Sequence, residues 1–284
     1  MMRLSVIVST YNRPDALRAV LAGLAEQSDR GFDVVVADDG SGDETRTAVA
    51  ECASASTVSV RHVWHEDKGF RLSAIRNLAA AQATGDYLVF IDGDCVPRLD
   101  FVMRHRALAE PGWMVAGNRL LLSESFTRTV LEQRLPIHRW DLADWWRARR
   151  ARELNRLGPL LRVPLGPLRK LGGRRWQRVR GCNMGIWKAD LLAVNGFDET
   201  FEGWGYEDSD MAVRLVNAGR RLNKGAYACG LLHLWHRESD RRQQGPNWDL
   251  LQQRIRSLET QPLKGIAPPR EPWAAVLPAE ATDS

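Results

Sequence analysis

Residues 87–95 read YLVFIDGDC, and the fold can be predicted by starting from this stretch. Five apolar residues, typical of a buried strand, lead directly into two carboxylates, Asp92 and Asp94, with Gly93 between them. Buried strands do not usually end in this way. The two negative charges therefore call for a chemical reason at the end of a hydrophobic strand.

The first hundred residues alternate between strand and helix patterns. Strand-like runs occur at 4–9, 32–37, 58–63 and 87–92, and helical spacing of apolar residues occurs at 12–27 and 71–85, with Gly85 expected as a helix stop. A short helix is also expected after the turn-rich stretch DDGSGDET. Continuous apolar strands separated by amphipathic helices predict an α/β fold with a mainly parallel sheet covered on both faces.

Polar clusters follow three of these strands. They are Thr10-Tyr11-Asn12, Asp38-Asp39 and Asp92-Gly93-Asp94. Ligands of such sheets bind beyond the carboxyl ends of the strands, so the three clusters are expected on one rim. The chain has neither GxGxxG after the first strand nor GxxxxGK[ST] anywhere, which disfavours a dinucleotide cofactor and a P-loop.

Asp92 and Asp94 suit Mg²⁺ or Mn²⁺, which takes one or two protein carboxylates together with substrate phosphates. The alternative is an Asp-Gly-Asp turn that caps the next helix, and the two residues alone leave both interpretations open. His233 and His236, three residues apart in GLLHLWH, are candidates to complete a metal shell.

A second acidic cluster lies in GWGYEDSD, residues 203–210. Trp204 between two glycines offers a flat surface for a sugar ring. Glu207 and Asp208 are expected at a helix N-terminus, where the helix dipole favours carboxylates. Helix capping explains part of this pattern, and a general base toward a hydroxyl group is the functional interpretation.

The chain of 284 residues carries a net charge of +5, which is unevenly placed. Residues 128–180 hold fifteen Arg and Lys against four acids, which favours an anionic partner. Solvated charge and nucleic-acid binding are alternatives, and the second is disfavoured because no recognition motif is present. Interleaved tryptophans favour an anionic membrane surface or a lipid-linked, phosphorylated acceptor; they are Trp140, Trp145, Trp146 and Trp176.

The four cysteines form no CxxC pair, so they are interpreted as incidental thiols of a reducing compartment. No run approaches the roughly 18 apolar residues that a spanning helix needs. We therefore expect a cytoplasmic protein, peripheral on the inner face of the cytoplasmic membrane if the basic segment binds lipid.

Seven motifs in this order resemble one family. They are VIVSTYNRP, VVVADDGS, DKGFRLSAIRN, FIDGDC, RGCNMGIWK, GFDETFEGWGYEDSD and HLWH. The chain resembles family-2 glycosyltransferases of the GT-A fold, with a carboxyl region similar to that of β-1,4-galactosyltransferases and the bacterial chondroitin polymerase. The resemblance covers residues 3–120 and 180–240, whereas 125–179 departs from it.

The resemblance implies a Rossmann-like GT-A fold, and together with the composition of the remaining segments it divides the chain into four parts. Residues 1–124 form the nucleotide-sugar-binding half, and 125–179 are a basic, Trp- and Arg-rich helical insertion. Residues 180–256 form the acceptor and catalytic half, and 257–284 are a loose C-terminal tail.

Roles for individual residues are also implied by the resemblance. Asp208 matches the catalytic base, Glu207 an acceptor contact and Trp204 a mobile, sugar-facing tryptophan. Asp94 and His236 match metal ligands, with His233 as a third whose position holds Met in one animal branch. Positions at or near the nucleotide sugar are implied for Thr10, Tyr11, Arg13, Asp39, Arg76, Asp92, Gly93 and Asn183.

The implied activity is an inverting, metal-dependent transfer from a nucleotide diphosphate sugar, with a uridine diphosphate donor and Mn²⁺ or Mg²⁺. The expected acceptor is a hydroxyl of a glycan or lipid-linked saccharide, in bacterial lipopolysaccharide or surface polysaccharide synthesis. A glycoside hydrolase would need no metal site. A sugar-nucleotide pyrophosphorylase would begin with a Gly-rich basic loop. A non-catalytic sugar-nucleotide or membrane-surface binding protein is the alternative from another class.

Overall fold

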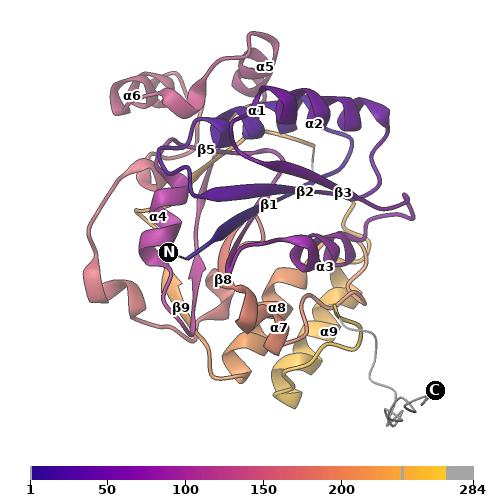
Figure 1. The fold of residues 1–284 in the computed structure, drawn as a ribbon. Coiled ribbons are helices and arrows are strands. Elements are labelled where there is room, and N and C mark those ends of the chain that lie inside the picture. The colour runs from indigo at the N-terminus through magenta and orange to yellow at the C-terminus, as the bar shows by residue number, and fades with distance from the viewer. Residues whose placement is uncertain (1, 238–239, 267–284) are drawn as a thin grey trace, which may run out of the picture.

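A seven-stranded sheet lies at the centre of the computed structural model, which describes residues 2–237 and 240–266 (Figure 1). Its strands in spatial order are β3 (Val60–Trp64), β2 (Phe32–Asp38), β1 (Leu4–Thr10), β4 (Tyr87–Asp92), β8 (Asn183–Trp187), β6 (Trp113–Ala116) and β9 (Arg221–Lys224). The first four run parallel, β8 is antiparallel to both neighbours, and β6 and β9 are parallel. The predicted mainly parallel sheet is confirmed.

Helices cover both faces of this sheet because its strands are apolar on both sides. Val6 and Val8 point into one core with α1 (Pro14–Ala25) and α2 (Asp43–Ala55). Ile7, between them, points into a second core with α3 (Leu72–Gln82), α7 (Lys188–Ala193) and α8 (Glu207–Asn217). Figure 1 shows α1 and α2 on one side of the strands and α3, α7 and α8 on the other. Alternate residues of one strand thus stabilise two separate layers.

Gly85 has a different role from the one expected. The helix α3 ends at Gln82, and Gly85 lies against the start of β1. A Cβ atom on Gly85 would come within 2.5 Å of the backbone nitrogen of Ser5. The glycine is needed for this close approach of the two backbones, and the expectation that it stops the helix was wrong.

A second sheet of three strands brings distant segments together. Its strand β10 (Leu231–His233) lies between β5 (Cys95–Pro97), which is antiparallel to it, and β7 (Arg119–Leu121), which is parallel. The register pairs His233 with Cys95, so His233 becomes a neighbour of Asp94. The helix α4 (Phe101–Leu108) follows β5.

The basic segment is only partly helical. It contains α5 (Glu124–Glu132), α6 (Leu142–Arg150) and four short 3₁₀ turns, at Ile137–Arg139, Gly158–Leu160, Gly166–Lys170 and Trp176–Arg178. Trp145 is fully buried, and the ring of Trp140 packs against it with centroids 5.0 Å apart. The assignment of Trp145 to an interface was therefore wrong, because it belongs to the core that α1 shares.

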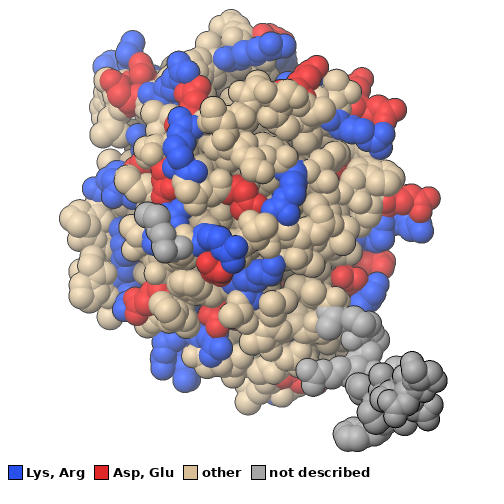
Figure 2. Space-filling model, in the orientation of Figure 1, with Lys and Arg blue, Asp and Glu red and all other residues tan. Residues whose placement is uncertain are grey.

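Many cations of the basic segment pair with acids elsewhere in the chain. Arg139 binds Glu26, Arg162 binds Asp100 at 2.7 Å and Lys170 binds Glu110 at 2.8 Å. On the face shown in Figure 2, basic and acidic side chains are correspondingly interspersed. These three ion pairs thus hold the segment to the domain.

The last helix, α9 (Gln244–Ser257), packs against α8, and the chain then continues along the same side. Within the predicted tail, the backbone N–H of Ile266 donates to the carbonyl of Asn195 at 3.1 Å. Residues 267–284 of that predicted tail lie outside the described part of the chain. In the two described ranges, no helix has the length and apolar character to cross a membrane.

Candidate active site

The strand ends predicted to share a rim lie side by side. Thr10 pairs with Asp38 and Ser9 with Asp92 in the sheet register, so β1, β2 and β4 end at the same edge. The N–H of Gly93 donates to the carbonyl of Ser9 at 2.7 Å. A Cβ atom on Gly93 would come within 2.9 Å of that carbonyl oxygen. Only glycine therefore lets the turn between the two acids pack on β1.

Two of the predicted nucleotide contacts stand on the outer part of this rim. Tyr11 is 49% exposed and donates its hydroxyl to Asp67 at 2.9 Å, which leaves the ring face accessible. Arg13, at the start of α1, pairs with Asp15 at 3.0 Å.

Asp39 lies deeper in the rim. Its carboxylate accepts the backbone N–H of Arg71 at 2.9 Å and lies 2.6 Å from the ring nitrogen of His65. Burial raises the pKa of Asp39, and these two partners oppose the rise. Asp39 is thus a buried, oriented acceptor next to Thr10, whose hydroxyl oxygen is buried with no hydrogen-bond partner in the described chain.

The three predicted metal ligands come together. Nε2 of His236 lies 3.4 Å from one oxygen of Asp94, and Nε2 of His233 lies 3.7 Å from the other. The Oδ1 atom of Asp94 is buried and has no hydrogen-bond partner among the described residues. A buried carboxylate oxygen without a donor is costly, so this atom fits a cation as its partner. One oxygen and two imidazole nitrogens suit a first-row divalent ion such as Mn²⁺.

The surroundings of both imidazoles are compatible with binding a metal through Nε2. Burial lowers the pKa of His233 to about 4, which keeps its ring neutral. Nδ1 of His236 lies 2.8 Å from the carbonyl oxygen of Arg237, so Nδ1 donates and Nε2 is left toward Asp94. Such a hydrogen bond on the outer nitrogen fixes the tautomer and the orientation of a ligand.

Arg76 connects the two acidic clusters. It is 1% exposed, and its guanidinium donates to Asp92 at 3.0 Å and to Glu207 at 3.2 Å. It also donates to Ser9 and to the carbonyl of Gly181. Arg76 thus bridges the strand-end acids and α8, and its contact with the nucleotide stays a prediction.

The first turn of α8 presents Glu207 and Asp208. Oδ2 of Asp208 accepts the N–H of Gly181 at 2.6 Å, which orients the carboxylate. Burial and, next, the charge of Asp208 raise the pKa of Glu207 to about 7, while Arg76 opposes the rise. The residue before the helix, Tyr206, has φ of 71°, a left-handed conformation that is strained for a tyrosine. Strain is thus stored directly beside these carboxylates.

Trp204 lies at the entrance to this region. It is 36% exposed, and the guanidinium of Arg241 lies 4.9 Å from its ring centroid. With Phe70 and Gln243 it lines a cavity of 390 Å³. The flanking Gly203 and Gly205 have φ of 71° and 116°, which a residue with a side chain rarely adopts.

Asn183 is not brought into the cleft. It is fully buried, and its amide donates to the carbonyls of Asn118 and Cys229 at 2.9 and 2.6 Å. Its oxygen lies 3.0 Å from the ring of His105. The side chain of Asn183 therefore fixes the chain after β6, and has no surface left for a donor sugar.

Two features of the site were not predicted from the sequence. The bridging role of Arg76 depends on partners at residues 92, 181 and 207, which no local pattern relates to one another. Arg119, on β7, reaches the sulfur of Cys182 at 2.7 Å beside Asp92. The place of Arg119 directly after Gly117-Asn118, between two strands, is the signal that could have indicated it.

Comparison with known families agrees with this geometry. The profile of "Glycosyl transferase family 2" matches residues 5–168, and that of "N-terminal domain of galactosyltransferase" matches residues 172–233. The first match extends through most of the basic segment.

Curated relatives cover most of this chain. Validoxylamine A glucosyltransferase of Streptomyces hygroscopicus subsp. jinggangensis is 30% identical over 225 residues, which are 75% of this chain and 51% of that protein. Chondroitin synthase of Escherichia coli is 26% identical over 76% of this chain and 32% of its own length. The chain thus spans about half the length, or less, of these relatives.

Solved structures share the fold. Staphylococcus aureus TarS 1–349 in complex with UDP has a TM-score of 0.62 at 18% identity, over 90% of this chain and 65% of that one. The mannosyltransferase PcManGT of Pyrobaculum calidifontis, in complex with GDP-Man and Mn²⁺, has a TM-score of 0.56 at 21% identity, over 84% and 58%. At these identities the likeness establishes the architecture alone.

Proposed function

The chain belongs to glycosyltransferase family 2, and from this premise we propose an inverting, cation-dependent transfer of a sugar from a uridine diphosphate sugar. The acceptor is a hydroxyl group of a glycan or a lipid-linked saccharide, in the synthesis of bacterial lipopolysaccharide or another surface polysaccharide. The observation that carries the proposal is the Asp94 oxygen that has no hydrogen-bond partner in the described chain and lies beside the imidazoles of His233 and His236 at the strand-end rim. The chondroitin synthase relative supports the polysaccharide setting.

The donor is proposed to lie along the rim from Tyr11 to Asp94. The exposed ring of Tyr11 suits stacking with the base, and Asp39 is held in place to accept hydrogen bonds from it. Two solved structures of the same fold contain UDP and GDP-Man, respectively, which supports a nucleotide in this position.

Asp94, His233 and His236 would hold the divalent cation. The PcManGT structure contains Mn²⁺, and the chemistry of the three ligands here fits Mn²⁺ or Mg²⁺. When bound, such an ion acts as a Lewis acid toward the diphosphate oxygens. Asp92 is held by Arg76, which orients its carboxylate beside this site.

Asp208 is proposed as the general base. It accepts the proton of the acceptor hydroxyl while that oxygen forms a bond to the anomeric carbon of the donor. The bond from this carbon to the diphosphate oxygen breaks, and the electron pair leaves with the diphosphate. Attack from the face opposite the leaving group inverts the anomeric centre. Glu207 and Trp204 are proposed to bind the acceptor sugar next to Asp208.

The experiment that tests the proposal measures hydrolysis of a panel of uridine diphosphate sugars with Mn²⁺, with Mg²⁺ and with EDTA. We expect hydrolysis of at least one donor that EDTA abolishes and that Asp94→Asn reduces. Hydrolysis that persists in EDTA would contradict the cation site. Donor binding without any turnover, alone or with acceptors, would instead support a binding protein of the same fold.

A contact with an anionic membrane on the cytoplasmic side is proposed for α6. Leu142 and Trp146 are 54% and 57% exposed, and Arg149 and Arg150 follow on the same side of the helix. Such a face suits a negatively charged lipid surface. Co-sedimentation with vesicles should increase with anionic lipid content and fall for Trp146→Ala, whereas binding insensitive to lipid charge would count against it.

A further inference from the structure

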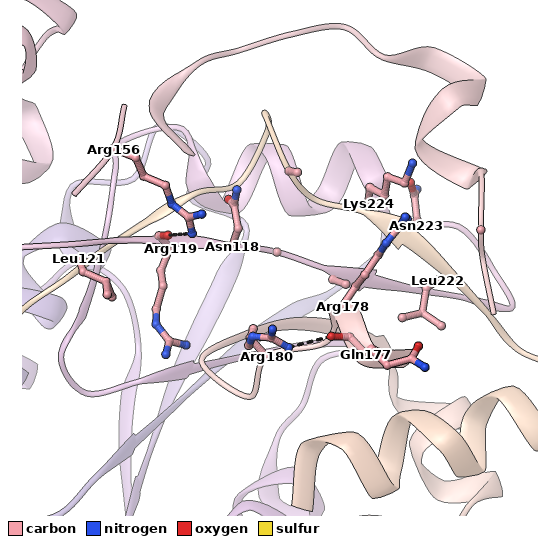
Figure 3. A pocket seen from close by; sticks show the side chains of 14 residues that line it. Asn118, Arg119, Leu121, Arg156, Gln177, Arg178, Arg180, Leu222, Asn223 and Lys224 are labelled. Atoms are coloured by element: carbon pink, nitrogen blue, oxygen red, sulfur yellow. Dashed lines mark hydrogen bonds between the residues drawn. The ribbon is translucent and has the colours of Figure 1, made fainter. Parts of the chain in front are cut away.

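A cavity of 590 Å³ lies beside the proposed base and has no role in the function proposed so far (Figure 3). Its walls come from the chain after β6, the start of β7, the end of β9 and the last part of the basic segment. Five cationic side chains line it: Arg119, Arg156, Arg178, Arg180 and Lys224. Its lining contains no Asp or Glu. The cavity is therefore electropositive.

Two of these five cations, Arg156 and Arg178, belong to the basic segment, and all five differ from the paired cations of that segment. Arg139, Arg162 and Lys170 each form an ion pair with an acid. Within residues 2–237 and 240–266, the five cations of the cavity form no ion pair within 4.0 Å. Concentrating like charges without partners is unfavourable, so this arrangement fits an anionic ligand.

Hydrogen bonds to carbonyl groups hold several of these guanidinium groups in place. Arg156 donates to the carbonyl of Arg119 at 2.9 Å, Arg180 to that of Gln177 at 2.9 Å and Arg178 to that of Leu171 at 3.2 Å. Figure 3 shows the first two of these contacts. A guanidinium has five N–H donors, so each retains others for a ligand. Pre-oriented donors lose less entropy on binding.

The cavity shares a wall with the proposed base. Arg180 lines it, and the next residue, Gly181, donates its N–H to Asp208 at 2.6 Å. A Cβ atom on Gly181 would lie 3.1 Å from the guanidinium of Arg76 and 3.4 Å from Asp208. Gly181 therefore packs closely against both groups, and Arg180 joins this contact to the lining of the cavity.

We propose that the cavity binds an anionic substituent of the acceptor, either a phosphate ester or a carboxylate on a sugar close to the reacting hydroxyl. This inference rests on the proposed function, because it places the acceptor at Asp208. Both groups accept the paired N–H donors of arginine, and charge-assisted hydrogen bonds of this kind are strong. The acceptor of this enzyme is accordingly an acidic saccharide.

The experiment compares three probes: a hexose 6-phosphate, a hexuronate and the neutral hexose. Their dissociation constants are measured by calorimetry at low ionic strength with the full chain. We expect an anionic probe to bind at least about tenfold more tightly than the neutral hexose, and the double variant Arg156→Gln/Arg178→Gln to lose this preference. The pair Arg152→Gln/Arg174→Gln removes the same charge from exposed positions outside the cavity, and should keep the preference.

Each result has a separate meaning. Tighter binding of the phosphate assigns a phosphate ester, and equal or tighter binding of the hexuronate assigns a carboxylate. Equal binding of all three probes, or equal losses in the two double variants, overturns the inference. Circular dichroism of both variants checks that they are folded. Donor hydrolysis by the unmodified protein is measured in parallel: if it is absent while the anion preference is present, the proposed function fails and the anion site stands.

Discussion

Two sides of the helix α8 carry acids of the same kind in opposite situations. Glu207 and Asp208, in its first turn, face the cleft, where one cation, Arg76, contacts Glu207 and reaches Asp92 as well. Asp210, two residues further on, faces the interior and is fully buried.

The interior side is a closed network of charges. Asp210 pairs with Arg214 at 2.7 Å and with Arg254 at 3.0 Å, and Arg254 pairs with Asp198 at 2.9 Å. Arg254 also donates to the carbonyl of Gln261 at 2.7 Å, which ties the chain after α9 to the domain. Buried charges are tolerated when paired in this way, so the network has a structural role.

The comparison shows that the pairing of an acid with a cation, rather than the residue type or its spacing, distinguishes the candidate catalytic acids of α8 from its structural acid. On the cleft side the carboxylates outnumber their cations, and burial keeps the pKa of Glu207 near 7. Groups with unusual proton affinity in a cleft are candidates for function. The following predictions test this division.

The largest effect is expected on the cleft side. Asp208→Asn should lower the rate of sugar transfer by about 10²–10⁴-fold, because the acceptor hydroxyl loses its base. Donor affinity and melting temperature should stay close to those of the unmodified protein. Transfer assays with calorimetric donor binding test this, with the exposed Asp249→Asn on α9 as the control. Near-normal transfer by Asp208→Asn would show that Asp208 is not the general base.

On the interior side the expected effect is on stability. Arg254→Ala leaves Asp198 without its buried cation and Asp210 with Arg214 alone, which should lower the free energy of unfolding by about 3–5 kcal/mol. Urea denaturation measures this loss. Arg256→Ala, exposed on the same helix, is the matched control and should change little. An Arg254→Ala protein that is stable but inactive would contradict the structural role that we assign to this network.

The cation site should respond through affinity. His236→Ala should weaken Mn²⁺ binding at least about tenfold, because two of the three ligands that we assign remain. Titration calorimetry without any sugar nucleotide measures this directly. Unchanged Mn²⁺ affinity would show that His236 is not a ligand.

The smallest effect concerns pH. Because the folded-state pKa of Glu207 is raised from 4.5 to about 7, the folded chain holds this proton between those values and the unfolded chain releases it. Stability from this group is present below pH 4.5 and is lost as the pH rises through 7. Relative to Glu207→Gln, the unmodified protein should thus lose on the order of 2 kcal/mol over this window. An equal loss of stability with rising pH in both proteins would show that a group other than Glu207 titrates.

The sheet and its rim were predictable because they depend on local patterns. Apolar runs such as 87–91 can be buried only as strands of this length, and the acids that follow parallel strands must meet at one edge. Convergence of Asp94 with His233 and His236 came from the family resemblance, and the register of β10 against β5 supplies its physical cause.

The remaining features depend on partners far away in the chain. Nothing around Asn183 shows that its amide would be used by Asn118 and Cys229. In the basic segment, Trp145 and Trp146 are neighbours on α6, a helix with few apolar residues to mark its buried face, so no pattern shows that Trp145 is buried while Trp146 is exposed. Arg214 is the exception, because its spacing of four from Asp210 is that of a helical ion pair.

The position of β10 between β5 and β7 has a consequence for how the protein matures. Both outer strands precede β10 in the chain, so the small sheet is completed by inserting a late segment between two early ones. Asp94 and His233 become neighbours only at this step. A chain with a correctly folded first half but a misplaced β10 would therefore lack the cation site that we propose, so we expect the Mn²⁺ content of a preparation to report the fraction of completed molecules.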